Sequence, residues 1–358
     1  MRLFLVLLAF ASLSTAGLRA QAPVDPFLSG LRWTHPASPV APWLPRDVAF
    51  AAGGELVWAA PTLANPHLLL LAAGEVASPA PELHASGPLT SAIGVVETAA
   101  NGADGLFAAA QFPDPVATSR RTEVYRYDGL GPGQGLPFAA VWTHDVGLKT
   151  NGPVRLDLDP SGTVLAAAVH DAANGVVQVD LLDPASGALA ARRTVAGNAL
   201  RSILLSEGGA LLAVSAGLDL WVLDAGGQTV HHEILASATE AVALSADGSL
   251  LAIGGFGELR VLVRQPGGGF APSFTIPAGS TEIAARAAVS GDGSTLAVGW
   301  WDFTTGVDVR FEIWDAEMQI RTHHLAQSGP AGGLQNYVQE IAVTADGARI
   351  AVGLWGVG

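Results

Sequence analysis

A short hairpin pattern recurs along the chain, and it restricts the fold more than any other feature of the sequence. Each copy has a short apolar stretch, a tight turn that contains glycine, and a second apolar stretch rich in Leu, Ala and Val. The clearest copies span residues 242–254 and 341–353. Asp-Gly and Gly-Gly pairs suit such turns, because hairpin turns need residues that tolerate positive φ. The turn glycines are Gly54, Gly105, Gly162, Gly209, Gly248, Gly293 and Gly347.

The spacing of these turns predicts the size of the repeating unit. Successive turn glycines lie between 39 residues (Gly209 to Gly248) and 57 residues (Gly105 to Gly162) apart. A four-stranded propeller blade takes about 40–45 residues, and longer units place the excess in loops. Most copies are followed by an alternating stretch and then by one more strand. Four strands per repeat is the composition of a propeller blade. The alternating stretches that end in Asp are 124–128, 179–183, 220–224 and 311–315.

The repeats resemble those of the WD40 and related YVTN-type propeller families. The resemblance is carried by the Ser/Thr-x-Asp-Gly turns at 245–248 and 344–347 and by Trp314-Asp315, and it covers roughly residues 45–358. It implies an all-β fold, a β-propeller of about seven blades that are four-stranded antiparallel sheets. The Gly-His dipeptide of intracellular WD40 repeats is absent, so the exported bacterial variety is the better match. Such blades host many unrelated activities, so the resemblance implies a fold and no particular function.

The last repeat provides only its first two strands, at about 339–344 and 349–354, before the sequence ends at Gly358. We therefore expect the last blade to be incomplete. A leading segment such as 28–34 is one source of an outer strand that would close the ring. The alternative, which we favour at this point, is that the chain is truncated at its C-terminal side. An unpaired strand edge would otherwise promote aggregation.

The first 22 residues have the features of a secretory signal peptide. Arg2 precedes an apolar run at 3–13, and small residues follow, with cleavage expected near Ala16 to Ala22. The apolar run is shorter than a membrane span, although an uncleaved N-terminal anchor is the alternative. We divide the chain into a signal peptide (1–22), a leader with a possible closing strand (23–44) and the propeller (45–358). The expected location is secreted or periplasmic.

Composition excludes several classes of function. The chain has a net charge of −14 at pH 7, with 18 Lys and Arg against 32 Asp and Glu, so no nucleic-acid partner is expected. It has no cysteine, which excludes disulfides, thiolate metal sites and cysteine nucleophiles. Hydrophobic residues make up 49% and charged residues 14%, which argues against disorder. No segment after the signal peptide is long and apolar enough to predict a membrane span.

One group of residues is a candidate ligand-binding site. Trp300, Trp301 and Asp302 stand where a second strand leaves its blade, and aromatic side chains at such positions can line the mouth of a central channel. The alternative is that the tryptophans pack between blades, which we favour because large aromatic side chains are usually buried. Trp355 occupies a similar place in its own repeat, which supports the structural interpretation.

Two other groups suggest metal sites. His231-His232 and His323-His324 fall on fourth strands, where neighbouring residues point to opposite faces, so neither pair is expected to chelate one ion. Acidic loop residues suit Ca²⁺, but turn chemistry explains them more simply. They are Asp157, Asp159, Asp171 and Asp302. We predict no metal, no cofactor and no catalytic residue, since no nucleophile elbow, zinc-protease or phosphate-loop motif occurs.

Three functions follow from this pattern, and the sequence leaves all three open. The first and favoured one is a non-catalytic interaction scaffold for a protein, peptide or glycan ligand. The second is a secreted or periplasmic hydrolase or lyase that acts on sugars or peptides at the channel mouth. The third is a structural cell-surface domain whose anchor lies in a missing C-terminal part. An enzyme should show converging polar groups with perturbed pKa values, and a binding module should show an apolar or aromatic patch on one face.

Overall fold

The computed structural model describes residues 4–9, 31–36, 45–51, 56–61, 69–72, 82–85, 96–100, 105–113, 120–128, 141–149, 154–302, 304, 309–315, 320–323 and 337–355. Side chains are described for 107, 109, 122–126, 141–147, 154–302, 304, 310–315 and 338–353. Almost all of these residues lie in β-strands or tight turns, and the described helix is a single 3-10 turn, Glu207–Gly209. The prediction of an all-β fold is therefore confirmed.

The described strands form seven four-stranded sheets, and neighbouring strands are antiparallel. Sheet 1 contains β3 (Pro45–Ala51), β4 (Leu56–Pro61), β5 (Leu69–Ala72) and β6 (Glu82–Ala85). Sheet 2 contains β7 (Val96–Ala100), β8 (Gly105–Pro113), β9 (Arg120–Asp128) and β10 (Trp142–Lys149). Sheet 3 contains β11 (Arg155–Leu158), β12 (Leu165–Asp171), β13 (Val176–Leu182) and β14 (Leu189–Ala196). Sheet 4 contains β15 (Leu200–Leu205), β16 (Leu211–Ala216), β17 (Asp219–Asp224) and β18 (Thr229–Ile234).

The remaining three sheets follow the same order, except the last. Sheet 5 contains β19 (Val242–Leu244), β20 (Leu250–Gly254), β21 (Glu258–Arg264) and β22 (Phe270–Pro277). Sheet 6 contains β23 (Glu282–Val289), β24 (Thr295–Asp302), β25 (Val309–Asp315) and β26 (Ile320–His323). Sheet 7 contains β27 (Tyr337–Val343), β28 (Arg349–Trp355), β1 (Phe4–Ala9) and β2 (Leu31–Pro36).

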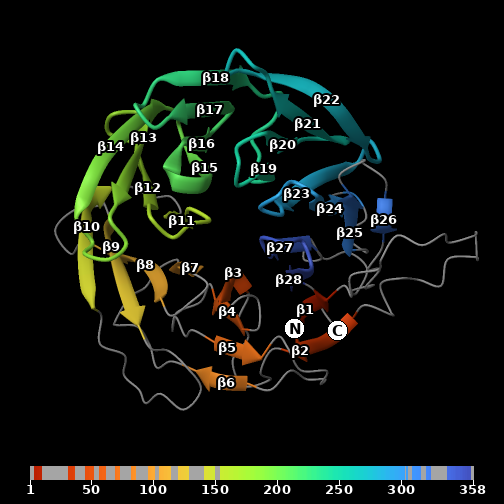
Figure 1. The fold of residues 1–358 in the computed structure, drawn as a ribbon, viewed down its shortest axis with the longest axis horizontal. Helices are drawn as coiled ribbons and strands as arrows, with labels where there is room; N and C mark the ends of the chain where they lie inside the picture. Colours follow the sequence, from red (N-terminus) through yellow and green to blue (C-terminus); the bar gives the residue numbers. More distant parts are fainter. Residues whose placement is uncertain are drawn as a thin grey trace, which may run out of the picture.

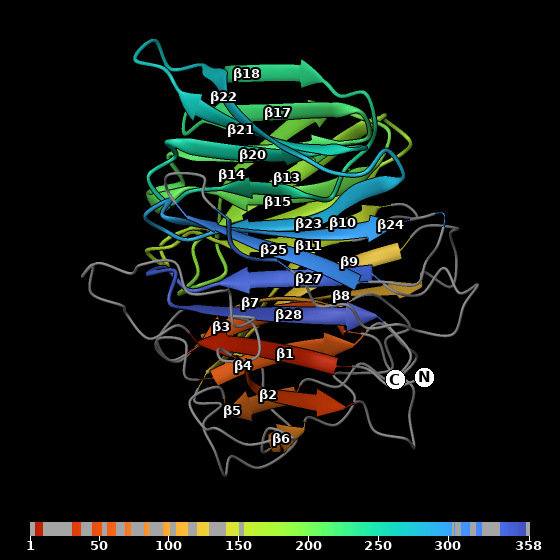
Figure 2. The same ribbon diagram turned by 90° about the vertical axis from the view of Figure 1, so that its right-hand side faces the viewer.

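The sheets are arranged around a common centre, with the first strand of each repeat innermost (Figure 1). The innermost strands β3, β7, β11, β15, β19, β23 and β27 contact one another in that order, and β27 also lies against β3. The strands run from one face of this ring to the other (Figure 2). We call the face at which the innermost strands begin the start face. The face at which they enter their first tight turn is the turn face.

Neighbouring sheets pack through apolar side chains that both of them contribute. Every residue of β12, β16 and β20 is buried, as expected for strands covered on both faces. Between sheets 4 and 5, Leu211 and Val222 belong to the same buried cluster as Leu251 and Ile253. The Leu-, Ala- and Val-rich second strands β12, β16 and β20 therefore fill the space between their sheets and the neighbouring ones.

The Ser/Thr-x-Asp-Gly turns share one hydrogen-bond pattern. In sheet 5, Ser245 Oγ accepts from the N–H of Leu250 at 2.9 Å and donates to Asp247 at 2.7 Å. Ser290 and Thr344 make the equivalent bonds in sheets 6 and 7. The glycine of each of these turns has a φ between +66° and +71°, a conformation that favours glycine. The predicted role of this motif as a hairpin turn is confirmed.

Backbone hydrogen bonds also connect each of these turns to the next one along the ring. Glu207 N–H donates to Ala246 O at 2.6 Å, Ala246 N–H to Gly291 O at 3.1 Å, and Gly291 N–H to Ala345 O at 2.9 Å. All four residues hold the second position of their turns. The turn face of sheets 4 to 7 is thus connected by a continuous series of backbone bonds, which we call the inter-turn chain.

Sheet 3 departs from this series because Pro160 holds the equivalent position and has no N–H to donate. A side chain takes over the connection. Asp159 Oδ2 accepts from Gly208 N–H of the next turn at 2.9 Å. The same carboxylate accepts from backbone groups of its own turn, including Thr163 N–H at 2.5 Å. Burial alone would raise the pKa of Asp159, but these hydrogen bonds lower it below its usual value.

The expectation of an incomplete last blade is wrong for this structure. β1 pairs antiparallel with β28, and β2 pairs with β1, so sheet 7 has four strands. β2 overlaps the leading segment 28–34 that was expected to provide an outer strand. β1, however, comes from within the predicted signal peptide. Export with cleavage near residues 16–22 would therefore remove the strand that pairs with β28.

Replacing Ser245 with Ala tests the turn motif. Ser245 is fully buried, and the loss of its hydroxyl leaves Leu250 N–H without its side-chain acceptor and removes one of the donors to Asp247. We expect Ser245→Ala to lower the free energy of unfolding by about 1–3 kcal/mol. Ser273→Ala, at an exposed position of β22, is the matched control and should stay within about 0.5 kcal/mol of the parent chain. Urea denaturation measures both, and equal effects would contradict the assigned role.

Removing residues 1–22 tests the contribution of β1. The deletion takes away the whole register from Phe4↔Leu354 to Ala9↔Arg349 and leaves the edge of β28 unpaired. We expect a lower melting temperature and concentration-dependent association, because exposed strand edges recruit other chains. Leu7→Pro in the full chain, which interrupts the same ladder, should reproduce the lower melting temperature. Scanning calorimetry and size-exclusion chromatography that show no change in either variant would mean that sheet 7 does not depend on β1.

Candidate functional site

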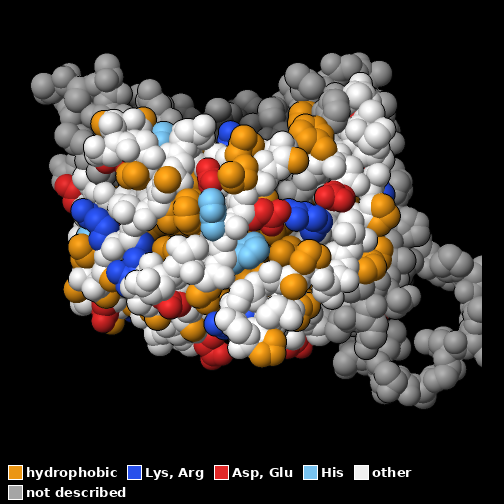
Figure 3. All heavy atoms as spheres, turned by 90° about the horizontal axis from the view of Figure 1, so that it is seen from above, with side chains coloured by type: hydrophobic (Ala, Val, Ile, Leu, Met, Phe, Trp, Pro, Cys, Tyr) orange, Lys and Arg blue, Asp and Glu red, His pale blue; other side chains and the backbone are white. Residues whose placement is uncertain are grey.

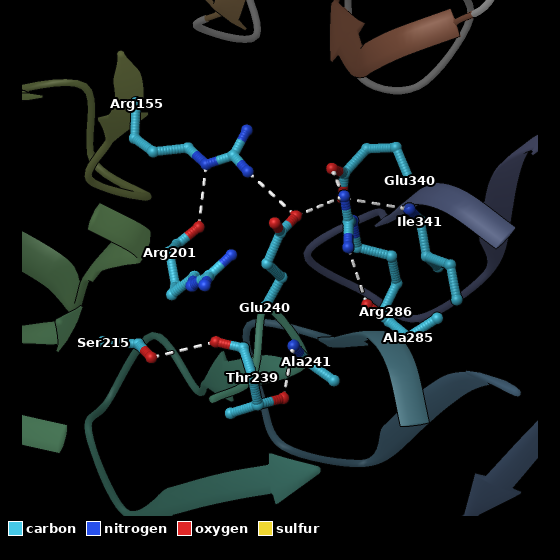
Figure 4. Close-up of polar contacts among 10 residues, drawn as sticks. All are labelled: Arg155, Arg201, Ser215, Thr239, Glu240, Ala241, Ala285, Arg286, Glu340 and Ile341. Atoms are coloured by element: carbon cyan, nitrogen blue, oxygen red, sulfur yellow. Dashed lines mark hydrogen bonds and ion pairs between the residues drawn. The ribbon is translucent and has the colours of Figure 1, made fainter. Parts of the chain in front are cut away.

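Five charged residues from consecutive innermost strands meet at the centre of the ring. Arg155 begins β11, Arg201 lies in β15, Glu240 precedes β19 by two residues, Arg286 lies in β23 and Glu340 in β27. Their side chains extend toward Glu240 in the middle of the group (Figure 4). We call these five residues the central cluster. Arg155, Arg201 and Glu240 lie toward the start face, because they stand at or before the beginning of their strands, whereas Arg286 and Glu340 lie near the middle of β23 and β27.

Glu240 is the hub of the ion pairs. Its Oε2 lies 2.9 Å from Arg155 Nη2 and 2.6 Å from Arg286 Nη2 (Figure 4). Arg286 Nε also lies 3.4 Å from Glu340 Oε2. Only 8% of the Arg155 side chain and 9% of the Arg286 side chain is exposed, so both guanidinium groups need nearby carboxylates. The cluster therefore connects sheets 3, 5, 6 and 7 across the centre.

The segment that carries Glu240 is held in place by buried polar bonds. Ser215 Oγ of β16 donates to Thr239 O at 2.9 Å, and Thr239 Oγ1 accepts from Ala241 N–H at 3.0 Å (Figure 4). Ser215 and Thr239 are both buried. These bonds fix the backbone on both sides of Glu240, so the carboxylate that two arginines share comes from a rigid segment.

Arg201 occupies a different environment from the other two arginines. Its carbonyl oxygen accepts from Arg155 Nε at 2.8 Å. Its own Nε is buried without a hydrogen-bond partner, and its guanidinium forms no ion pair with any side chain that the structure describes. Among the described members of the cluster, three positive charges therefore meet two negative ones.

Asp157 lies on the same side of β11 as Arg155, because alternate residues of a strand share a side. Its carboxylate accepts a hydrogen bond from Leu205 N–H of β15. Ser206 N–H donates to Leu211 O of β16. Since successive N–H groups of a strand point to opposite edges, the N–H of Leu205 points to the inner edge of β15. Burial and, to a smaller extent, the nearby charge of Asp159 raise the pKa of Asp157 to about 8, against the opposing effect of the hydrogen bond from Leu205.

The predicted binding residues Trp300, Trp301 and Asp302 do not form one surface. Trp300 is fully buried, packs in the core shared by sheets 5 and 6, and lies under the Arg310 guanidinium at 5.2 Å. Trp301 and Asp302 are partly buried, and Asp302 accepts from Thr304 N–H at 2.9 Å. The packing alternative describes Trp300 well. A binding role for the three residues stays a prediction.

His231 and His232 lie on outer strand β18, and their side chains point to opposite faces of the strand. His232 stacks on Trp221 with ring centroids 3.7 Å apart and bonds Asp219 at 2.8 Å. His231 instead meets the edge of Phe270 in sheet 5, at 5.8 Å. Histidine side chains are visible on this outer wall among acidic, basic and apolar groups (Figure 3). The expected divergence of the pair is confirmed for His231 and His232. His323 lies in β26, and His324 is outside the described residues.

The acidic loop residues mostly serve turns, as the simpler alternative predicted. Asp159 accepts from five backbone or hydroxyl donors around its turn, Asp171 accepts from the side-chain amide of Asn174 at 2.9 Å, and Asp302 accepts from Thr304. Asp157 is the exception. Within the part of the chain that the structure describes, no three His, Asp or Glu side chains gather as a metal site would require.

A second buried charge cluster joins sheets 2 and 3 away from the centre. Asp180 of β13 is fully buried and receives Arg192 Nε at 2.6 Å and Nη2 at 2.8 Å. His144 Nε2 of β10 lies 3.1 Å from Asp180 Oδ2, the oxygen that also accepts from Arg192 Nη2. Burial would raise the pKa of Asp180, but the bonds from His144 and Arg192 outweigh it and hold the pKa below its usual value. This cluster ties two sheets together.

Sequence reasoning missed the central cluster, although a signal for it was present. Arg155, Arg286 and Glu340 each stand four residues before the first residue of their turn motif, and Arg201 and Glu240 stand five before theirs. Alignment of the repeats on their turns would have brought all five into nearly the same register. In β15, β23 and β27 a bulge lies at or beside the charged residue.

No protein-family model matches the sequence, and a search of curated proteins finds no match either. In the described residues, no helix has the length and apolarity needed to cross a bilayer.

Asp157→Asn tests the raised pKa of this carboxyl group. Folding moves the pKa from 3.8 to about 8, so the folded chain holds more protons than the unfolded chain between these values. The free energy of unfolding therefore falls as pH rises from about 4 to about 8, by at most about 1.4 kcal/mol per pH unit from this group. Asn cannot titrate and keeps an oxygen for Leu205 N–H.

We expect the Asp157→Asn chain to lose this fall and to be more stable than the parent chain at pH 8. Urea denaturation at several pH values measures the difference. Asp145→Asn, at an exposed position of β10, controls for the chemical change. Parallel pH profiles for the parent and Asp157→Asn would show that Asp157 is not held in its neutral form.

Proposed function

We propose that the chain is a seven-bladed β-propeller of the WD40-like class that serves as a non-catalytic binding scaffold. Four properties support the fold: four-stranded sheets, a first strand that is innermost, contacts between successive innermost strands, and the contact of β27 with β3. Each sheet would then be one blade. The N-terminal strands β1 and β2 would complete the seventh blade beside β28 and β27.

The observation that carries the binding role is the chemistry of the start face. Arg155, Arg201 and Glu240 of the central cluster lie toward this face, and large apolar side chains are exposed on the same face. Leu218 is 45% exposed, Ile234 71% and Phe256 56%. Leu218 and Phe256 lie in turns after second strands, and Ile234 ends an outer strand, so all three are at the start face. A charged centre beside exposed apolar side chains suits a ligand with both kinds of group.

The ligand class that we propose is a protein, peptide or glycan outside the cytoplasm. The N-terminal signal-like sequence supports an exported, secreted or periplasmic location, and the pairing of β1 with β28 requires that residues 4–9 stay on the exported chain as an uncleaved segment. A rigid ring of sheets holds its face with little conformational entropy left to lose, which favours binding. A structural role at the cell surface is the alternative to ligand binding.

A glycan and peptide array screen tests this proposal. The triple variant Leu218→Ser, Ile234→Ser and Phe256→Ser should weaken any specific binding at least tenfold, which corresponds to about 1.4 kcal/mol. Leu189→Ser with Val263→Ser removes exposed apolar groups at the turn-face ends of β14 and β21 and is the matched control. Equal loss in both variants, or no specific binding by the parent chain, would overturn the assignment of the start face.

Asp157 favours a second candidate, a hydrolase or lyase. A carboxyl group that keeps its proton near neutral pH is a suitable general acid, and this one lies on the same side of β11 as Arg155. Incubation of the chain with the ligands identified on the array, followed by mass spectrometry, tests it. Turnover that Asp157→Asn abolishes would establish the enzyme, and binding without any product would exclude it for those ligands.

A further inference from the structure

The charges of the central cluster are unequal among the described residues. Glu240 Oε2 is shared by Arg155 and Arg286, and Glu340 is engaged by Arg286. Both carboxylates are therefore already beside a guanidinium group. Arg201 is the third positive charge, and none of the described carboxylates lies within ion-pair distance of it.

Arg201 is also poorly supplied with hydrogen-bond acceptors. A guanidinium group has five N–H donors and no acceptor, so it needs several oxygen atoms around it. The Nε of Arg201 is buried and has no hydrogen-bond acceptor among the protein groups around it. A guanidinium with an unsatisfied buried donor is unfavourable for folding alone. It is favourable where a ligand provides the missing oxygen atoms.

We propose that Arg201 binds the carboxylate group of a ligand at the centre of the start face. The inference rests on the binding role proposed above and adds the chemistry of the group that is recognised. A planar guanidinium fork matches the two oxygens of a carboxylate. Arg155, whose Nε bonds the carbonyl of Arg201, adds a second positive charge beside the site.

The carboxylate of Glu240 favours a singly charged group over a phosphate dianion at this site. Glu240 lies between Arg155 and Arg286, and it would repel a second negative charge on that side more than a single one. The site is therefore expected to select an acidic sugar or an acidic peptide end over a phosphorylated ligand.

Three related sugars test the proposal on the full-length chain: D-glucuronate, D-glucose and glucose 6-phosphate. Isothermal titration or ligand-observed NMR at low salt should detect glucuronate with a dissociation constant in the millimolar range. Glucose, which lacks the charge, should not bind detectably, and glucose 6-phosphate should bind at least threefold more weakly than glucuronate. Tighter binding of the phosphate would overturn the selectivity for a carboxylate.

Arg201→Ala should weaken glucuronate binding at least tenfold, and Arg201→Lys should weaken it less, because lysine keeps the charge and loses the fork. Arg264→Ala, at an exposed end of β21, is the matched control and should bind as the parent chain does. The melting temperature of unliganded Arg201→Ala should not fall, since no described carboxylate loses a partner.

Two results would overturn the proposal: no glucuronate binding at tens of millimolar, or equal binding by the parent chain and Arg201→Ala. Its failure can be separated from failure of the binding role. If binding of the array ligands still requires Leu218, Ile234 and Phe256, the start face remains the binding surface, and only the role of Arg201 in it is excluded.

Discussion

The inter-turn chain is the constraint on which the arrangement of the sheets depends. Apolar packing brings neighbouring sheets together, but it is non-directional and allows them to slide. Backbone bonds from Glu207 to Ala246, Ala246 to Gly291 and Gly291 to Ala345 fix the height of each turn relative to the next. The Ser/Thr-x-Asp-Gly motif supports these inter-turn bonds. Hydrogen bonds within each turn fix its backbone, so that the N–H and C=O of the second turn residue point to the neighbouring turns.

The exception in sheet 3 shows that the connection matters. Pro160 removes the backbone donor, and the side chains of β11 provide three bonds to sheet 4 instead. Arg155 donates to the carbonyl oxygen of Arg201. Asp157 accepts from the N–H of Leu205, and Asp159 accepts from the N–H of Gly208. Arg155 and Asp157 belong to innermost strand β11, so the side chains that join sheets 3 and 4 also lie next to the candidate site.

Some parts of this fold could be predicted from sequence because they depend on local chemistry. The turn at Ser245–Gly248 is a local pattern, and the divergence of His231 and His232 follows from strand geometry alone. Ion pairs that join residues from different repeats, such as Arg155 with Glu240, depend on how the sheets come together around the centre. No spacing within one repeat reveals them. The pairing of β1 with β28 joins the two ends of the chain. The sequence of the last repeat contains only the first two strands of its sheet, so from that repeat alone we predicted an incomplete sheet.

Amide hydrogen exchange measured by NMR tests the inter-turn chain most directly. The N–H groups of Glu207, Ala246 and Gly291 lie in turns, where amides normally exchange quickly, yet each donates to the next turn. They should exchange as slowly as the amides of the buried strand β20. Gly226 and Gly267, at exposed turn positions, provide the fast reference. Exchange of the three amides at the rate of Gly226 and Gly267 would contradict the account, because the sheets would then be held by packing alone.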